Sequence, residues 1–139
     1  MPGSDFAARI ERIVRMLNHG EVLPVLEEFY RHDARFFEND FLFAEGPQEA
    51  RERQANFLDT CSSFEGIVDL VHADAGRGIS VLHNRSRFAH DDYGTGAVNG
   101  IHVQYWQGGM VAREEYYSGD RVEEMLGFWR GVAKASPRV

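Results

Sequence analysis

Apolar positions recur at helical spacing through the first part of the chain. In three segments, side chains three and four positions apart form one apolar stripe, which is typical of amphipathic helices. Residues 34–38 read instead as a short strand, and the polar pair Asn39 and Asp40 interrupts it. The predicted helices cover residues 6–17, 22–30 and 47–61.

After Phe64 the pattern changes to runs rich in Val, Ile, Tyr and Phe, separated by turns that contain glycine. Such runs are typical of antiparallel strands. A last apolar stripe, formed by Val122, Met125, Leu126 and Trp129, predicts a C-terminal helix. Strands are predicted over residues 65–73, 78–91, 97–106 and 110–117.

This order of elements predicts an α+β fold in which three N-terminal helices pack on a curved, mostly antiparallel sheet and a short helix follows. We interpret residues 1–139 as a single domain with its core at about residues 5–132. A strongly twisted sheet can curl around its helices and leave a conical hollow. Hollows of this kind are where small ligands usually bind.

Gly108 and Gly109 predict a hairpin between the last two strands, because tight turns need the positive φ that glycine adopts without strain. The type of turn decides which side chains face one another. A two-residue turn places His102 opposite Glu115, whereas a three-residue turn with a bulge places Ile101 opposite Glu115. We favour the bulged turn, which keeps Glu115 on the inner face.

Side chains alternate along the strand that precedes this hairpin. Ile101, Val103 and Tyr105 form its apolar side, which we expect to face the helices. His102 and Gln104 would then face solvent or a partner subunit. This direction weighs against His102 as a catalytic base, although a histidine suits that role near neutral pH.

Composition narrows the class of function. The chain has 139 residues, 43% of them hydrophobic, and a net charge of −7. This charge disfavours nucleic acid and anionic membrane surfaces as partners, since both need a basic face. No apolar run is long enough to span a membrane and no signal peptide is apparent, so we expect a cytoplasmic protein.

No cofactor or metal is expected. Cys61 is the single cysteine, which leaves no disulfide and no cysteine metal cluster. The histidines are scattered without the spacing of metal ligands. The glycine-rich turns lack a nucleotide-binding motif.

Glu38 is the first candidate for catalysis. It follows two phenylalanines at the end of the short strand, and a carboxyl group in apolar surroundings is a useful general acid or base. Phe36 and Phe57 are expected to line the pocket beside it. The alternative is a strand end that is solvated or held in a salt bridge.

A second group of charged and polar residues lies on two predicted strands, where alternation places each set on one face. Buried charges must be paired, so we expect Glu38 or Glu115 to meet Arg85 or Arg113. The arginines could instead bind a carboxylate ligand, or the charges could face water or a partner subunit. The group consists of His83, Arg85 and Arg87 on one strand and Arg113, Glu115 and Tyr117 on the other.

The runs VLEEFYRHDARFFEND, EGPQEARERQANFL and IHVQYWQGGMVAREEYYSGD resemble the SnoaL-like polyketide cyclase family. That family belongs to the nuclear-transport-factor-two-like (NTF2-like) superfamily, whose fold is a cystatin-like cone. The resemblance covers about residues 6–130. It implies a pocket between the helices and the concave face of the sheet, and homodimers joined through the sheet.

Two enzymes of that superfamily bear on the candidate residues. Its ketosteroid isomerases carry a proton-shuttling carboxylate at the position of Glu38, but isoleucines stand here in place of their two oxyanion donors. Its limonene-epoxide hydrolases match at Arg85 and Glu115, but Arg87 stands in place of their second carboxylate. An arginine cannot act as that acid, so epoxide hydrolysis is not predicted. Steroid isomerisation is not predicted either, because the oxyanion donors are missing.

The sequence therefore predicts a small-molecule binding protein or a cofactor-independent acid–base enzyme, of isomerase, cyclase or hydrolase type, acting on a hydrophobic oxygenated compound. The alternative is a non-catalytic dimeric module that binds a ligand or another protein. The residues expected to be catalytic are Glu38, Glu115 and Arg85. The residues expected to contact the ligand are Phe36, Phe57, His83, Arg87, Val103, Arg113 and Tyr117.

Overall fold

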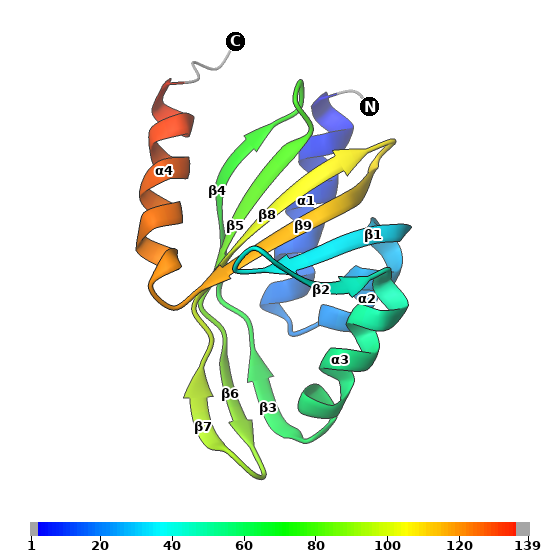
Figure 1. Ribbon diagram of the computed structural model, residues 1–139, viewed down its shortest axis with the longest axis vertical. Helices are drawn as coiled ribbons and strands as arrows, with labels where there is room; N and C mark the ends of the chain where they lie inside the picture. The colour runs from blue at the N-terminus through cyan, green and yellow to red at the C-terminus, as the bar shows by residue number, and fades with distance from the viewer. Residues whose placement is uncertain (1–2, 136–139) are drawn as a thin grey trace.

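A computed structural model describes residues 3–135 of the chain, apart from the side chain of Asn56. This part contains four helices and nine strands (Figure 1). The predicted α+β class is confirmed, with three helices before most of the strands and one helix after them. The helices are α1 (Gly3–Asn18), α2 (Val22–Phe29), α3 (Pro47–Asp59) and α4 (Arg121–Ala135).

The main sheet has six strands in the order β2-β1-β9-β8-β5-β4. Neighbouring strands are antiparallel except for β1 and β9, which run parallel. This pairing joins an early strand to the last strand of the chain. The strands are β1 (Tyr30–Glu38), β2 (Phe41–Glu45), β4 (Val68–Asp74), β5 (Ile79–Asn84), β8 (Gly100–Gln107) and β9 (Met110–Ser118).

A second sheet of three strands lies at the lower end of the molecule in Figure 1. Its order is β3-β6-β7, and all its pairs are antiparallel. The strands are β3 (Cys61–Glu65), β6 (Arg87–His90) and β7 (Gly94–Ala97).

Helices cover both faces of the main sheet. On one face, α1 and α2 bury Ile13 and Phe29 together with Leu82 of β5. On the other face, α4 packs over Val81 of β5 and Val103 of β8. Val81 and Leu82 are neighbours in one strand and enter opposite cores, as the alternation of side chains requires. A homodimer joined through the sheet stays a prediction.

The predicted strand over residues 78–91 is two strands, so the prediction of one continuous strand was wrong. The backbone N–H of Arg85 donates to the carbonyl oxygen of Ile67 at 2.7 Å, which takes the chain out of the main sheet. β5 ends before this point, and β6 continues in the second sheet. The sequence placed His83 and Arg87 on one face because side chains alternate along a strand. This alternation does not continue from β5 into β6.

The hairpin turn at Gly108 and Gly109 has two residues, and both glycines have positive φ, 61° and 82°. The register then shifts because β9 carries an extra residue, Ala112, that opposes no residue of β8. Val103 therefore lies opposite Glu115. Neither of the two registers expected from the sequence is present.

The faces of β8 are also reversed from the prediction. Val103 and Ile101 pack under α4, whereas His102 and Gln104 face the cavity beneath α1–α3. The prediction assumed that the apolar side of the strand faces the only core. It was wrong because helices cover both faces of this sheet, so the more apolar side of a strand does not identify the face that α1–α3 cover.

Candidate ligand pocket

A cavity of about 380 Å³ lies between the three N-terminal helices and the main sheet. Most of its wall is apolar, which is the usual character of a site for a small molecule. Side chains from α2, α3, β1 and β2 form this wall. Among them are Val25, Leu26, Phe36, Phe43 and Phe57.

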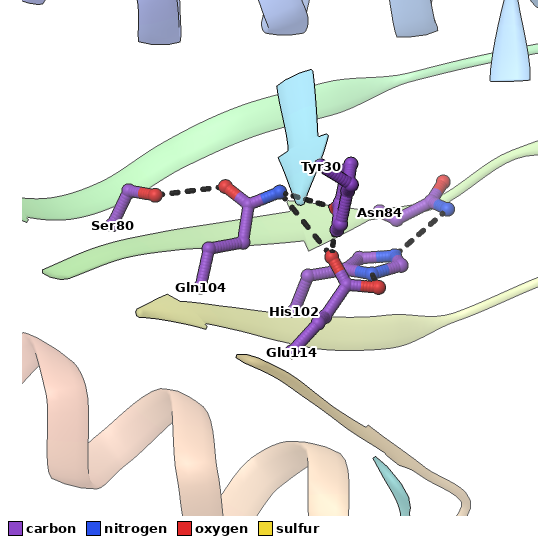
Figure 2. Close-up of polar contacts among 6 residues, drawn as sticks. All are labelled: Tyr30, Ser80, Asn84, His102, Gln104 and Glu114. Atoms are coloured by element: carbon purple, nitrogen blue, oxygen red, sulfur yellow. Dashed lines mark hydrogen bonds and ion pairs between the residues drawn. The ribbon is translucent and has the colours of Figure 1, made fainter. Parts of the chain in front are cut away.

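The floor of the cavity is polar and is formed by neighbouring strands of the sheet (Figure 2). The hydroxyl of Tyr30, on β1, donates to Oε1 of Glu114, on β9. Nε2 of Gln104, on β8, donates to the Tyr30 hydroxyl at 2.9 Å and to Oε1 of Glu114 at 3.2 Å. One carboxylate oxygen thus accepts two bonds from buried donors.

The orientation of Gln104 is fixed from its other side. The hydroxyl of Ser80 donates to Oε1 of Gln104 at 2.7 Å, and Nε1 of Trp106 donates to Oγ of Ser80 at 2.8 Å. Gln104 is only 1% exposed, so its amide must be paired within the protein. With its oxygen held by Ser80, its NH₂ group points at Glu114.

His102 binds the second oxygen of the same carboxylate. Its Nδ1 lies 3.5 Å from Oε2 of Glu114, and Nδ2 of Asn84 lies 3.4 Å from its Nε2 (Figure 2). Because an amide nitrogen only donates, Nε2 accepts and the proton of the neutral ring is on Nδ1, facing Glu114. In this arrangement Nε2 of His102 carries the free lone pair, so it is the atom that can accept a proton.

The network holds Glu114 as a carboxylate. Burial opposes its ionisation, but the electrostatic interaction with His102 and the hydrogen bonds from His102, Tyr30 and Gln104 outweigh burial, so the pKa of Glu114 lies below its ordinary value. Burial and the neighbouring Glu114 raise the pKa of Tyr30 well above its ordinary value. At neutral pH the floor therefore contains an anionic carboxylate bound by a neutral phenol.

Tyr116 and Glu38 also line the cavity. The ring of Tyr116 lies against the ring of His102, with centroids 4.7 Å apart. Burial, together with the charges of Glu38 and Glu114, raises the pKa of Tyr116 to about 12. The phenol is therefore a neutral donor at physiological pH.

Of the residues predicted from the sequence, Glu38, Phe36 and Phe57 line this cavity together. Arg85 is instead exposed and pairs with Asp69. The prediction that Arg85 faces a pocket failed because the chain bends out of the main sheet there. Two neighbours also lie outside the cavity, since His83 binds Asn99 through its Nε2 at 2.8 Å and Arg87 is exposed.

The remaining predicted residues lie on the α4 side of the sheet. Oε1 of Glu115 accepts bonds from the hydroxyls of Tyr105 at 3.2 Å and Tyr117 at 3.1 Å. Its Oε2 pairs with Arg113 at 2.7 Å, so one of the predicted Arg–Glu pairs is present. Glu115 and Tyr117, with Val103, line a separate cavity of about 300 Å³ under α4. Glu38 and Glu115 therefore do not share a pocket.

Sequence reasoning missed Tyr30, Gln104, Glu114 and Tyr116. A signal was present, because residues 102 and 104 on one strand and 114 and 116 on the next share one face by simple alternation. All of these positions carry polar or aromatic side chains. The register of the hairpin was needed to decide that this face belongs to the cavity.

The described residues contain no group of His, Cys, Asp and Glu side chains that could hold a metal ion. Among the same residues, no helix is both long and apolar enough to cross a membrane. The chemistry available in the cavity is that of carboxylates, phenols, amides, an imidazole and the guanidinium of Arg53.

No protein-family model and no curated protein matches the sequence. Solved structures do match in three dimensions. A candidate SnoaL-like polyketide cyclase from Jannaschia sp. has a TM-score of 0.67 over 97% of this chain and 94% of its own, at 16% identity. An NTF2-like protein of unknown function from Burkholderia pseudomallei has a TM-score of 0.65 over 88% of this chain and 95% of its own, at 12% identity.

The chain has the NTF2-like fold. The resemblance inferred from the sequence is thereby confirmed at the level of the fold. TerC, which was co-crystallised with polyporic acid, shares this fold with a TM-score of 0.62 over 88% of this chain and 97% of its own, at 10% identity. A de novo designed protein with a curved sheet also matches, with a TM-score of 0.55 over 95% and 99% of the two chains, at 11% identity. A fold shared this widely does not determine function, so the function must be inferred from the cavity.

Proposed function

We propose that this NTF2-like protein binds a hydrophobic, oxygenated small molecule in the 380 Å³ cavity and exchanges a proton with it through His102, without a cofactor. One observation carries this proposal. Glu114, whose side chain is 12% exposed, faces Nδ1 of His102 at 3.5 Å, and both residues line an otherwise apolar cavity.

The roles of the two residues follow from their hydrogen bonds. Glu114 already accepts bonds from Tyr30 and Gln104, so it is best suited to orient His102 and to stabilise the imidazolium ion. His102 keeps a lone pair on Nε2, which the 3.4 Å contact with Asn84 engages only weakly. His102 is therefore the proton acceptor, and an imidazole is well matched to this role near neutral pH.

Glu38 is proposed as a second acid–base group, because it lines the same cavity and neighbours Tyr116. Glu115 and Arg85 are left out of the proposed mechanism, since neither lines this cavity. The co-crystallisation of TerC with polyporic acid supports the use of this fold for binding small molecules.

Isothermal titration calorimetry with hydroxylated bicyclic ketones and phenols tests the proposal. Proton NMR of the ketones in D₂O then measures whether the protein exchanges the hydrogens next to the carbonyl for deuterium. The wild-type protein should bind with proton exchange, and His102→Gln should bind without it. His83→Gln changes a histidine outside the cavity and should keep the wild-type exchange. Unchanged exchange in His102→Gln would refute the role of His102, and absence of binding to the wild type would refute the proposed function.

A further inference from the structure

Tyr116 is a polar group of the cavity that the proposed proton transfer does not use. It lines the cavity from β9, directly opposite His102 of β8. Among the described residues its hydroxyl has no hydrogen-bond partner, whereas the hydroxyls of Tyr30, Tyr105 and Tyr117 all donate to carboxylates. A half-buried phenol without a partner is available to a ligand.

Gly100 fixes the position of this phenol. A Cβ atom at Gly100 would lie 2.2 Å from both Cε1 and the hydroxyl oxygen of Tyr116, and 2.3 Å from its Cζ. The aromatic ring therefore lies directly on the backbone of β8 at a place that only glycine permits. With the ring of His102 against it at 4.7 Å, the phenol is held beside the proposed base.

The charges around the phenol indicate which ligands it can meet. Glu38 and Glu114 both act on Tyr116, so any anion that approached its hydroxyl would be repelled by two carboxylates. Arg53 is the one arginine among the described lining residues, and it lies on exposed helical surface, 3.5 Å from Glu49. The floor thus offers a neutral donor and no cation.

We infer that the Tyr116 hydroxyl donates to a carbonyl oxygen of the ligand and that the cavity selects an uncharged carbonyl compound over a carboxylate. This inference rests on the proposed function and names the class of ligand for it.

Three bicyclic probes with matched rings test this inference: a hydroxytetralone, the tetrahydronaphthol that lacks its carbonyl, and the corresponding tetrahydronaphthoate anion. Tyr116→Phe keeps the ring and removes only the hydroxyl. It should weaken the binding of hydroxytetralone by roughly five- to tenfold, the effect of one lost hydrogen bond, and should change the binding of tetrahydronaphthol by less than about twofold. Tyr93→Phe changes an exposed tyrosine and should alter neither.

Infrared spectroscopy distinguishes a hydrogen bond from Tyr116 to the ligand from a purely structural role of Tyr116, because only the hydrogen bond changes the carbonyl stretch. The carbonyl stretch of bound hydroxytetralone should lie at lower frequency in the wild type than in Tyr116→Phe. Gly100→Ala should displace the phenol and produce the same selective loss of affinity, with little further loss in the double variant.

Each other result would overturn the inference. Equal weakening of hydroxytetralone and tetrahydronaphthol by Tyr116→Phe, or an unchanged carbonyl stretch, would refute the role of Tyr116 and leave the proposed function intact. Binding of tetrahydronaphthoate as tight as that of hydroxytetralone would refute the selection against anions. If none of the probes bound to the wild type, both proposals would fail.

Discussion

The hydroxyl of Tyr30 donates to the carboxylate of Glu114, a residue 84 positions later in the chain. The two residues lie on β1 and β9, the parallel pair of the main sheet. Their bond therefore joins the strand that leaves the N-terminal helices to the last strand of the sheet. It also places the buried carboxylate of Glu114 on the floor of the cavity, 3.5 Å from Nδ1 of His102.

Replacing Glu114 by Gln should lower the free energy of unfolding by about 1–3 kcal/mol. The change removes the charged acceptor of Tyr30 and His102 and turns an NH₂ group toward buried donors. Urea unfolding followed by circular dichroism measures the effect. Glu52→Gln, on the exposed surface of α3, is the matched control and should stay within about 0.5 kcal/mol of the wild type. Equal stability of the two variants would contradict the buried network.

Stability should fall in acid partly through the protonation of Glu114. Its pKa in the folded protein is lowered, so its contribution is fully present above the unfolded pKa of about 4.3 and is lost as the pH falls through the folded value. The difference in unfolding free energy between wild type and Glu114→Gln should therefore shrink as the pH is lowered from about 6 to 3. Urea midpoints across this range measure it. A difference that does not depend on pH would show that the folded pKa is not lowered.

At high pH the tyrosines should limit stability. Burial, followed by neighbouring carboxylates, raises the pKa of Tyr105 and Tyr116 to about 12 and moves those of Tyr30 and Tyr117 in the same direction. A raised folded pKa gives stability that is fully present below the unfolded pKa of about 10 and is lost as the pH rises through the folded value. Phenolate absorbance should show these four phenols ionising later in the folded protein than in urea. Coincident titration curves would contradict their burial.

The sequence was most informative where one face of an element is buried. Helix periodicity identified all four helices of residues 3–135, and the diglycine identified the hairpin, because both signals are local. β2 was missed because Asn39 and Asp40 were taken to interrupt the strand, and no element was assigned to the segment that follows. Both residues have positive φ, 47° and 77°, so the chain reverses tightly there and pairs back on β1.

The site was predicted only in part, because local patterns identify some of its residues and contacts between distant segments decide the others. Glu38 was found because a carboxylate at the end of an aromatic strand is visible in the sequence. Glu114 and Gln104 were not, since their assignment to the cavity depends on the bulge in β9 and on the packing of α4 over the opposite face. Both features arise from contacts between distant segments, which alternation along a single strand does not contain.

Two glycines should respond to alanine in opposite directions. A Cβ atom at Gly66 would lie 1.9 Å from the carbonyl oxygen of Leu17, a backbone atom that cannot move aside cheaply. Gly66→Ala should therefore destabilise the protein by at least about 2 kcal/mol. Gly127 lies in α4 with open space around it, so Gly127→Ala should stabilise the protein by about 0.5–1 kcal/mol through better helix propensity. Thermal unfolding of both variants tests the close packing of α1 against the strand that follows Gly66, and similar melting temperatures would contradict it.

Ligand affinity should not depend on Glu115 or Arg85, although both were predicted from the sequence to be catalytic. Glu115 binds Tyr105, Tyr117 and Arg113 on the α4 side of the sheet. Glu115→Gln should therefore lower the free energy of unfolding by about 1 kcal/mol while leaving the affinity for hydroxytetralone within about twofold of the wild type. Arg85→Ala removes only an exposed ion pair, so both its stability and its affinity should stay near those of the wild type. Calorimetric titration of the two variants beside Tyr116→Phe compares the two faces directly. A loss of affinity in Glu115→Gln as large as that in Tyr116→Phe would place the ligand under α4, in the smaller cavity, and not beneath the N-terminal helices.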